Sequence, residues 1–151
     1  MGVTVAAAVA GCLMVATEFS TITWVDVAND SCQVINDSNP SLADRCKLSG
    51  FERHGGSVLI LGLAAMVMGW GAGIGGSRPA AMALVAIGVV VIAIGAFSDV
   101  PESGKTGAIG PRFAGAKGKK GTGLYLECIG GGFAVWAGAF RLAARRPDES
   151  P

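Results

Sequence analysis

The sequence predicts an all-α protein, a bundle of four transmembrane helices with two long loops on one side. Four apolar stretches divide the chain, and a helix of ~20 apolar residues spans the ~30 Å hydrocarbon core of a bilayer. Of the 151 residues, 51% are hydrophobic and 15% are charged, whereas soluble domains carry about 25% charged residues. The whole chain, 1–151, is therefore expected to be a single integral membrane domain.

The predicted helices carry very few charges. They are expected at 3–25, 57–75, 79–97 and 123–144. The first contains only Glu18, and the fourth contains Glu127 near its start and Arg141 near its end, while the second and third contain no charge. Helices that are apolar on every side are typical of lipid contact or full burial.

Two long loops, 26–56 and 98–122, are expected to share one side of the membrane, because four spans return both termini to the other side. A tight turn at 76–79 joins the second helix to the third, and a polar tail covers 145–151. The distribution of Lys and Arg leaves the orientation open. The loops hold more basic residues, but those on the side of the termini lie in shorter segments closer to the membrane.

The cysteines favour one orientation. Cys32 and Cys46 both lie in the loop 26–56, and a disulfide between them would persist only in an oxidising compartment. Closing a loop of about 15 residues stabilises a fold by about 3 kcal/mol. We therefore expect a cell-membrane protein with cytoplasmic termini, external loops and a Cys32–Cys46 disulfide, with two unrelated thiols as the alternative.

Small residues recur at four-residue spacing in two of the predicted helices, as they do at close helix contacts in membranes. The candidate packing positions are Gly69, Gly73, Gly130, Ala134 and Gly138. This pattern favours helices that pack closely, either within one chain or against another copy or a larger complex. The alternative is that Gly and Ala are simply common in this chain.

Glu18 and Glu127 are the candidate functional residues. A carboxylate within a membrane segment is costly and marks a functional site by default. Both are expected near the same face of the membrane, where they would line one polar pocket. The alternative is two separate carboxylates at the interface, each in contact with water.

Other chemistry finds little support. His54 is the only histidine, and its neighbours Asp44, Glu52, Cys32 and Cys46 lack zinc-type spacing, so no metal is expected. No catalytic triad is indicated, and neither an enzyme nor a cofactor is expected. A net charge of +1 gives no reason to expect a nucleic acid partner, although the basic loop 98–122 is expected to reach anionic lipid headgroups.

Three segments resemble small four-helix membrane proteins of actinobacteria that remain uncharacterised. The segments are 76–86 (Gly-Ser-Arg-Pro-Ala-Ala-Met-Ala-Leu-Val-Ala), 107–110 (Gly-Ala-Ile-Gly) and 123–127 (Gly-Leu-Tyr-Leu-Glu). The resemblance implies a bacterial membrane location and no particular activity. The layout is also similar to claudin-type tetraspan proteins, although this chain lacks the Gly-Leu-Trp motif that those proteins carry before their cysteine pair.

These patterns predict a non-catalytic multi-pass membrane protein, a structural or accessory subunit that packs through its Gly/Ala helix faces. The alternative is a small oligomeric channel or transporter that uses Glu18 and Glu127. The bilayer is the expected partner, together with a second copy of the chain or a larger membrane complex.

Overall fold

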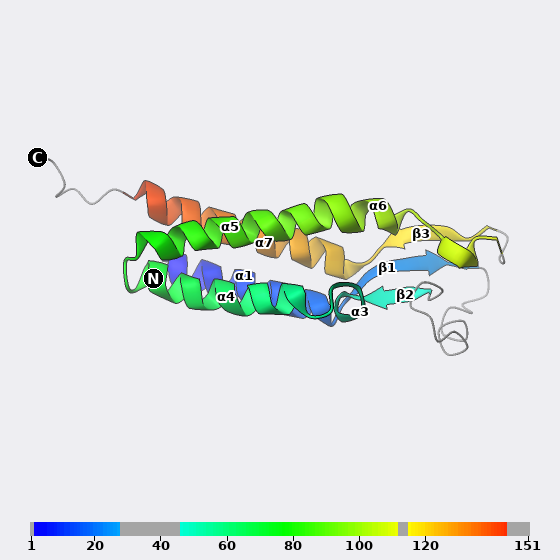
Figure 1. The fold of residues 1–151 in the computed structure, drawn as a ribbon, viewed down its shortest axis with the longest axis horizontal. Coiled ribbons are helices and arrows are strands. Elements are labelled where there is room, and N and C mark those ends of the chain that lie inside the picture. Colours follow the sequence, from blue (N-terminus) through cyan, green and yellow to red (C-terminus); the bar gives the residue numbers. More distant parts are fainter. Residues whose placement is uncertain (1, 28–45, 112–114, 145–151) are drawn as a thin grey trace, which may run out of the picture.

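A computed structural model describes residues 2–27, 46–111 and 115–144. Its longest helices are α1 (Gly2–Glu18), α4 (Ser57–Gly73), α5 (Arg78–Ile94) and α7 (Thr122–Ala143). They lie side by side in an elongated bundle (Figure 1), in which α1 and α5 each pack against both α4 and α7. The described part of the chain is mainly helical, as the sequence predicts.

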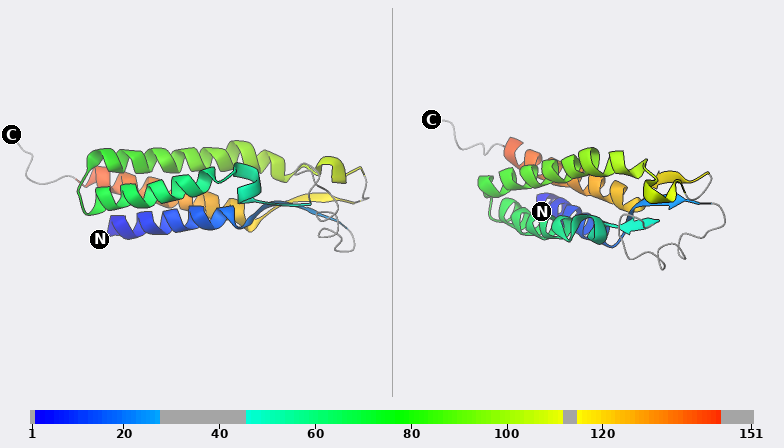
Figure 2. Two further views of the ribbon diagram at one scale, coloured as in Figure 1. Left: turned by 60° about the horizontal axis from the view of Figure 1, so that its bottom comes forward. Right: turned by 45° about the vertical axis from the view of Figure 1, so that its right-hand side comes forward.

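A small antiparallel sheet extends from one end of the bundle (Figure 2). Its central strand β1 (Thr21–Asp26) pairs with β2 (Lys47–Ser49) on one side and with β3 (Lys117–Lys120) on the other. We call this the sheet end of the bundle. The opposite end, where α1 begins, α7 ends and a turn joins α4 to α5, is the turn end. The all-α prediction is wrong at the sheet end, because the predicted loops 26–56 and 98–122 each supply one strand.

The first helix is shorter than predicted. It ends at Glu18 rather than at residue 25, and the segment 21–26 is β1. This segment reads Thr-Ile-Thr-Trp-Val-Asp, and β-branched and aromatic residues suit a pleated, half-buried strand better than a helix. Hydropathy alone predicted one continuous helix, because Ile22, Trp24 and Val25 are as apolar as the helix before them.

The other helices keep their predicted places with changed ends. α4 ends at Gly73, and α5 begins at Arg78, where the Ser77 hydroxyl accepts a hydrogen bond from the backbone N–H of Ala80 at 3.3 Å. α5 continues beyond the predicted end at residue 97, through the π-helix η2 (Gly95–Asp99) and the short helix α6 (Val100–Ser103). α7 lies within one residue of its prediction at both ends.

Length and composition allow two of these helices to cross a membrane. They are the continuous helix Arg78–Ser103, of 26 residues, and Thr122–Ala143, of 22 residues. α1 and α4 are apolar helices of 17 residues each. Of the four helices that the sequence predicts to span the membrane, two therefore meet the criteria of length and composition.

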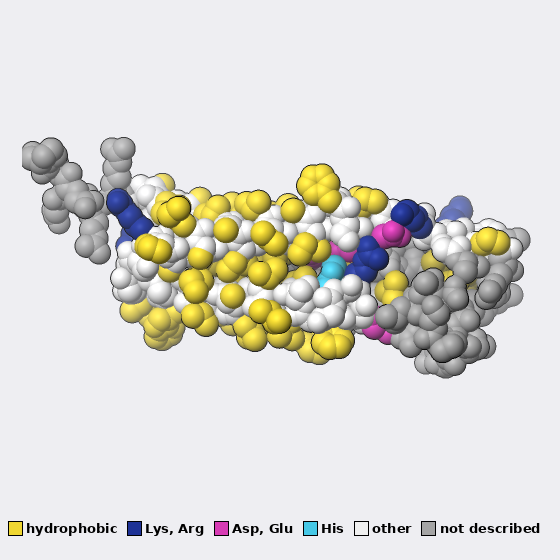
Figure 3. Space-filling model, in the orientation of Figure 1, with side chains coloured by type: hydrophobic (Ala, Val, Ile, Leu, Met, Phe, Trp, Pro, Cys, Tyr) yellow, Lys and Arg dark blue, Asp and Glu magenta, His cyan; other side chains and the backbone are white. Residues whose placement is uncertain are grey.

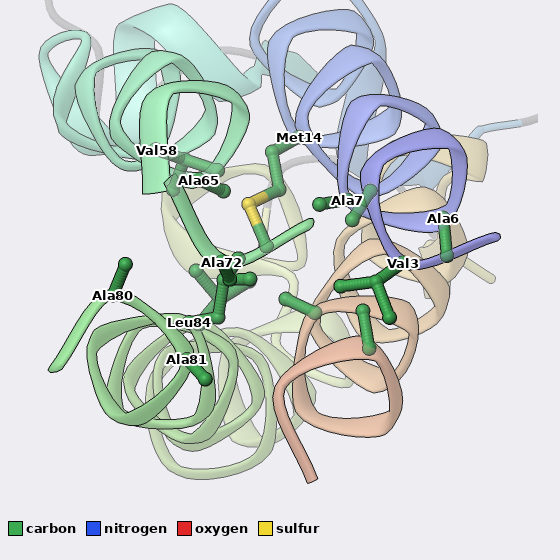
Figure 4. Close-up of a cluster of buried hydrophobic side chains, with 14 residues drawn as sticks. Val3, Ala6, Ala7, Met14, Val58, Ala65, Ala72, Ala80, Ala81 and Leu84 are labelled. Carbon is green, nitrogen blue, oxygen red and sulfur yellow. The ribbon is translucent and has the colours of Figure 1, made fainter. Parts of the chain in front are cut away.

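The interior of the bundle consists mostly of small side chains (Figure 4). Alanines from all four long helices fill the space between them, and the larger fully buried residues of this cluster are Met14, Val58, Leu84 and Val91. Small side chains let the backbones approach closely, and this closeness increases van der Waals contact along the helices.

The predicted packing positions of α4 face α1 of the same chain. Gly69 lies against Ala7, and Gly73 lies against Thr4. A side chain at either glycine would overlap α1. These positions are thus occupied within the chain, and a partner molecule would have to contact other surfaces.

The predicted packing positions of α7 face two different helices. Gly130 lies against Ala10 of α1, where an added Cβ would be 3.1 Å from the carbonyl oxygen, while Gly138 lies against Ala81 of α5. Ala134, between them, is completely buried in the core. The small residues at four-residue spacing in α7 therefore contribute to contacts with two different helices.

Arg141 of α7 closes the turn end. Its Nε donates to the carbonyl oxygen of Ala72 at 2.9 Å, and its Nη2 donates to that of Gly76 at 3.0 Å. Carbonyls in the last turn of a helix have no partner within the helix, and a cation there also interacts favourably with the helix dipole. Arg141 therefore caps α4 from a distant part of the sequence.

Candidate functional site

Ionisable side chains from four elements gather between the helices and the sheet. They are Glu18 of α1, His54 of α3 (Gly50–His54), Asp99 of η2 and Glu127 of α7. Glu18, Asp99 and Glu127 are completely buried, and the side chain of His54 is 6% exposed. Figure 3 shows histidine, acidic and basic surfaces next to one another near the sheet end, beside the largely apolar surface of the helices.

Glu18 caps the N-terminus of α4. Its Oε1 accepts hydrogen bonds from the backbone N–H groups of Val58 at 2.9 Å and Leu59 at 3.1 Å. The local N-cap of α4 is Gly56, which has no side chain to accept them. A carboxylate at this position satisfies two free donors and interacts favourably with the helix dipole, so Glu18 has a structural role.

The short helix α3 is held in place at both of its ends. At its start, Ser49 and Glu52 form a capping box, in which the Ser49 hydroxyl accepts from the Glu52 N–H at 3.3 Å and the Glu52 carboxylate accepts from the Ser49 N–H at 3.0 Å. At its end, Gly55 has a φ of 60°, which glycine adopts without a Cβ penalty. The backbone N–H of Gly50 also donates to Ser20 at 3.0 Å, which fixes α3 beside the end of α1.

Arg53 joins α3 to η2. Its Nε lies 3.1 Å from Oδ1 of Asp99, and its Nη2 donates to the carbonyl oxygen of Ser98 at 3.2 Å. The other carboxylate oxygen of Asp99, Oδ2, lies 3.3 Å from Nε2 of His54. Single-turn π-helices are frequent at functional sites, and here η2 places Asp99 between the two basic residues of α3.

Glu127 completes the cluster. Its Oε2 lies 4.0 Å from Nε2 of His54, and neither of its oxygens has a hydrogen-bond partner among the described residues. The neighbouring position on η2 is Gly95, where an added Cβ would be 3.7 Å from the Glu127 carboxylate. Burial of a polar group without a partner is costly, so this carboxylate requires an explanation beyond folding.

The arrangement of charges has a clear chemical consequence. One ligand atom each from His54, Asp99 and Glu127 lie within 4.8 Å of one another. Two buried carboxylates at such a separation repel each other unless a proton or a cation offsets their charge. We name these three residues the triad cluster. It can hold a proton or a metal ion.

The two carboxylates predicted from the sequence thus occupy the same end of the bundle in different surroundings. Glu18 binds the backbone of α4, whereas Glu127 faces His54 and Asp99. Asp99 was not identified from the sequence and His54 was assigned no role, because the members of the cluster come from separate segments and have no diagnostic spacing. The only available signal was the position of Asp99, directly after an apolar stretch.

The predicted disulfide remains a prediction, since Cys32 lies outside the described residues, as does Asp44. Cys46 is buried beside β1, with its Sγ 3.0 Å from the carbonyl oxygen of Val25. The fourth candidate neighbour of His54, Glu52, belongs to the capping box. None of the described sequence neighbours is therefore part of the triad cluster.

The basic loop predicted to contact anionic lipid contains β3. Lys119 of this strand forms an ion pair with Asp26 of β1, with 2.6 Å between Nζ and Oδ2, and lies over the ring of Trp24 at 4.9 Å from the ring centroid. Lys117 and Lys120 are exposed on the same edge strand. Contact of this strand with lipid headgroups remains a prediction.

Comparison of the chain with protein-family models, with curated proteins and with solved structures finds no match. Function is therefore inferred from the geometry of the bundle and of its sheet end.

Proposed function

We propose that this chain is a non-catalytic multi-pass membrane protein, a structural or accessory component whose bundle holds the small sheet on one side of the bilayer. One observation carries the proposal: the buried positions of the helices are mainly small, while large apolar side chains cover the outside (Figure 3). Among the exposed residues are Ile60, Val67, Trp70, Met82, Val89, Phe133, Trp136 and Phe140. Apolar surface of this extent is unusual for a soluble monomer and suits contact with lipid.

The helix lengths are compatible with this location. At 1.5 Å per residue, helices of 17 to 26 residues measure about 26 to 39 Å, near the ~30 Å of the hydrocarbon core. The 17-residue helices α1 and α4 are at the lower limit of this range. They are short enough to place the triad cluster near the membrane surface.

The contacts of the cluster among the described residues give no support for a hydrolytic triad. Nε2 of His54 has no hydrogen-bond partner among the described residues, so no serine or cysteine nucleophile is paired with that nitrogen, as a hydrolytic triad requires. The alternative of a channel or transporter is favoured by the burial of Glu127. However, Met14, Leu84 and Val91 fill the middle of the bundle, so a conducting path would need an interface between copies.

The location can be tested through the cysteines of α1 and α7. Cys12 and Cys128 are both on the outside of the bundle, where the proposal places lipid. In native membranes, we expect both thiols to resist a membrane-impermeant maleimide until detergent is added, because a thiol in the hydrocarbon core does not form the reactive thiolate. Peptide mass spectrometry would assign each label to its cysteine.

The matched control is Lys117→Cys, which places a thiol on an exposed position of β3. This thiol should react with the impermeant reagent in membranes without detergent, and in intact cells if the sheet is external. Rapid reaction of Cys12 and Cys128 with the impermeant reagent would overturn the membrane location. Ion flux in proteoliposomes that disappears in Glu127→Gln would favour the transporter alternative over a structural role.

A further inference from the structure

We propose that the triad cluster of His54, Asp99 and Glu127 is a binding site for a divalent transition-metal ion of the Zn²⁺, Co²⁺ and Mn²⁺ class. The three ligand atoms lie within 4.8 Å of one another and come from α3, η2 and α7. The inference goes beyond the proposed function and does not depend on it, because the site exists wherever the bundle resides.

The distances suit one shared ion. Nε2 of His54 lies 3.3 Å from Oδ2 of Asp99 and 4.0 Å from Oε2 of Glu127. With Zn–N and Zn–O bonds of about 2.0 to 2.2 Å, two ligands of a tetrahedral ion lie about 3.4 Å apart. These two separations bracket this value, and all three ligand atoms lie within 4.8 Å of one another, so side-chain movements of about 1 Å would bring them to bonding distance.

The atoms of the cluster that lack partners are the second observation. In the part of the chain that the structure describes, Oδ2 of Asp99, Nε2 of His54 and both oxygens of Glu127 make no hydrogen bond to a residue outside the cluster, although Asp99 and Glu127 are completely buried. Within the cluster, Oδ2 and Nε2 are 3.3 Å apart. Burial of several such groups costs free energy unless something binds them. One cation between the three side chains would satisfy an atom of each.

The surrounding contacts orient the ligands as they do in metal sites. Arg53 Nε lies 3.1 Å from Oδ1 of Asp99, which leaves Oδ2 directed to His54. Partners of this kind fix the geometry of ligands and are part of metal sites. Two ionised carboxylates offset the charge of a divalent ion, and neutral imidazole adds a nitrogen lone pair.

The ligand types select the class of ion. Imidazole together with carboxylates suits Zn²⁺, Co²⁺ or Mn²⁺, whereas Ca²⁺ and Mg²⁺ prefer sets of oxygen ligands alone. Three protein ligands leave at least one position of the ion for water or another ligand. A bound ion would also tie α3, which follows β2, to the helices of the bundle.

The test is a Co²⁺ titration of the full chain in detergent micelles, after treatment with chelator and removal of any histidine tag. Visible absorption bands of Co²⁺ report its coordination directly, and Zn²⁺ is then added to displace it. We expect one ion per chain with a Kd in the micromolar range or below. Glu127→Gln and His54→Gln should each weaken binding at least about tenfold, since even outer partners of metal ligands contribute 10-fold to 100-fold.

The matched control is Glu102→Gln, which removes a carboxylate at the same end that pairs with Lys105 at 2.8 Å and lies outside the cluster. Its Co²⁺ affinity should equal that of the native chain. If Glu127→Gln does not fold, the Co²⁺ affinity of His54→Gln tests the proposal, because His54 ends a short helix outside the bundle core and its substitution should leave the fold intact. A native Kd weaker than 100 µM, equal binding by His54→Gln, or displacement of Co²⁺ by equimolar Mg²⁺ would overturn the proposal. The cysteine-labelling result stands independently of these outcomes.

Discussion

The two ends of α4 are capped by opposite charges from other helices, and the comparison separates structural from functional polar residues. At the turn end, the guanidinium of Arg141 binds two backbone carbonyls. At the sheet end, the carboxylate of Glu18 binds two backbone N–H groups. Each charge thus binds backbone groups that have no partner within the helix. Buried polar atoms without hydrogen-bond partners among the described residues occur at both ends, on Thr4 at the turn end and on Glu18, His54, Asp99 and Glu127 at the sheet end. Among the described residues, a cluster of three possible metal ligands is found at the sheet end alone.

The same contrast exists between two glutamates at one end. Glu18 and Glu127 are equally buried, but the first stabilises a helix terminus and the second binds no backbone group in the described residues. A buried carboxylate that binds the N–H groups of a helix terminus supports folding, whereas two buried carboxylates in one cluster repel each other and reduce stability. Substitutions of Glu18 and Glu127 should therefore change the free energy of unfolding in opposite directions.

The largest effect is expected from Glu18→Ala. This change leaves the N–H groups of Val58 and Leu59 buried without an acceptor, and hydrogen bonds to charged groups contribute 1.5–3 kcal/mol each. We expect the free energy of unfolding to fall by about 3 kcal/mol, measured by denaturation in mixed micelles. Glu18→Gln retains an acceptor oxygen and should lose about half as much. Equal losses from the two variants would argue against the capping role.

The second effect is a stabilisation. Without metal, Glu127→Gln removes a buried charge that repels Asp99, and its amide can donate to Oδ2 of Asp99. We expect the free energy of unfolding in chelator to rise by about 2 kcal/mol. Glu102→Gln serves as the control and should change little. A destabilised Glu127→Gln would mean that the native carboxylate makes a stabilising contact, as Glu18 does, and would contradict the contrast between the two glutamates.

Zn²⁺ should make the native chain more stable than Glu127→Gln, the reverse of the order expected in chelator. A ligand that binds only the folded state stabilises it by about 2.7 kcal/mol at a concentration of 100 Kd. The native chain should therefore unfold at a higher temperature with Zn²⁺ than in chelator, while Glu127→Gln should show a much smaller shift. Thermal scans of both proteins in parallel make the measurement, and identical shifts would contradict a metal site at this end.

A smaller effect is expected at the turn end. Arg141→Met leaves the partly buried carbonyls of Ala72 and Gly76 without donors, which should cost about 1.5 kcal/mol. Arg141→Lys retains the charge but not the paired donors, and it should cost less. Neither variant should alter Co²⁺ affinity, because the cluster is at the other end. A change in affinity would show that the two ends are coupled.

The smallest effect is expected on the sheet. Lys119→Ala removes an ion pair with Asp26 in which the two side chains are 48% and 47% exposed, and exposed pairs contribute about 0.5 kcal/mol or less. Its contact with Trp24 adds a similar amount. The unfolding midpoint should move only slightly. A loss comparable to that of Glu18→Ala would show that the sheet, rather than the caps, controls stability at this end.

The sequence predicted parts of this end and missed others for identifiable reasons. Glu18 and Glu127 were recognised because charges within apolar stretches are conspicuous. The strand 21–26 was missed because an apolar strand that directly follows an apolar helix does not change the hydropathy, although its β-branched residues carried a signal. Asp99 and His54 were not connected, since nothing local relates residues of separate segments.

By itself, the sequence determined that the chain is mainly helical and, apart from 21–25, where its four long apolar helices lie. Helix propensity and hydropathy are properties of neighbouring residues, so they can be read locally. Only the tertiary structure decided that 21–26 pairs with strands from both predicted loops, that Glu18 caps α4, and that His54, Asp99 and Glu127 meet. Strand pairing, distant caps and ligand clusters require several segments to be placed to within a few ångströms, and that placement results from the packing of the whole bundle.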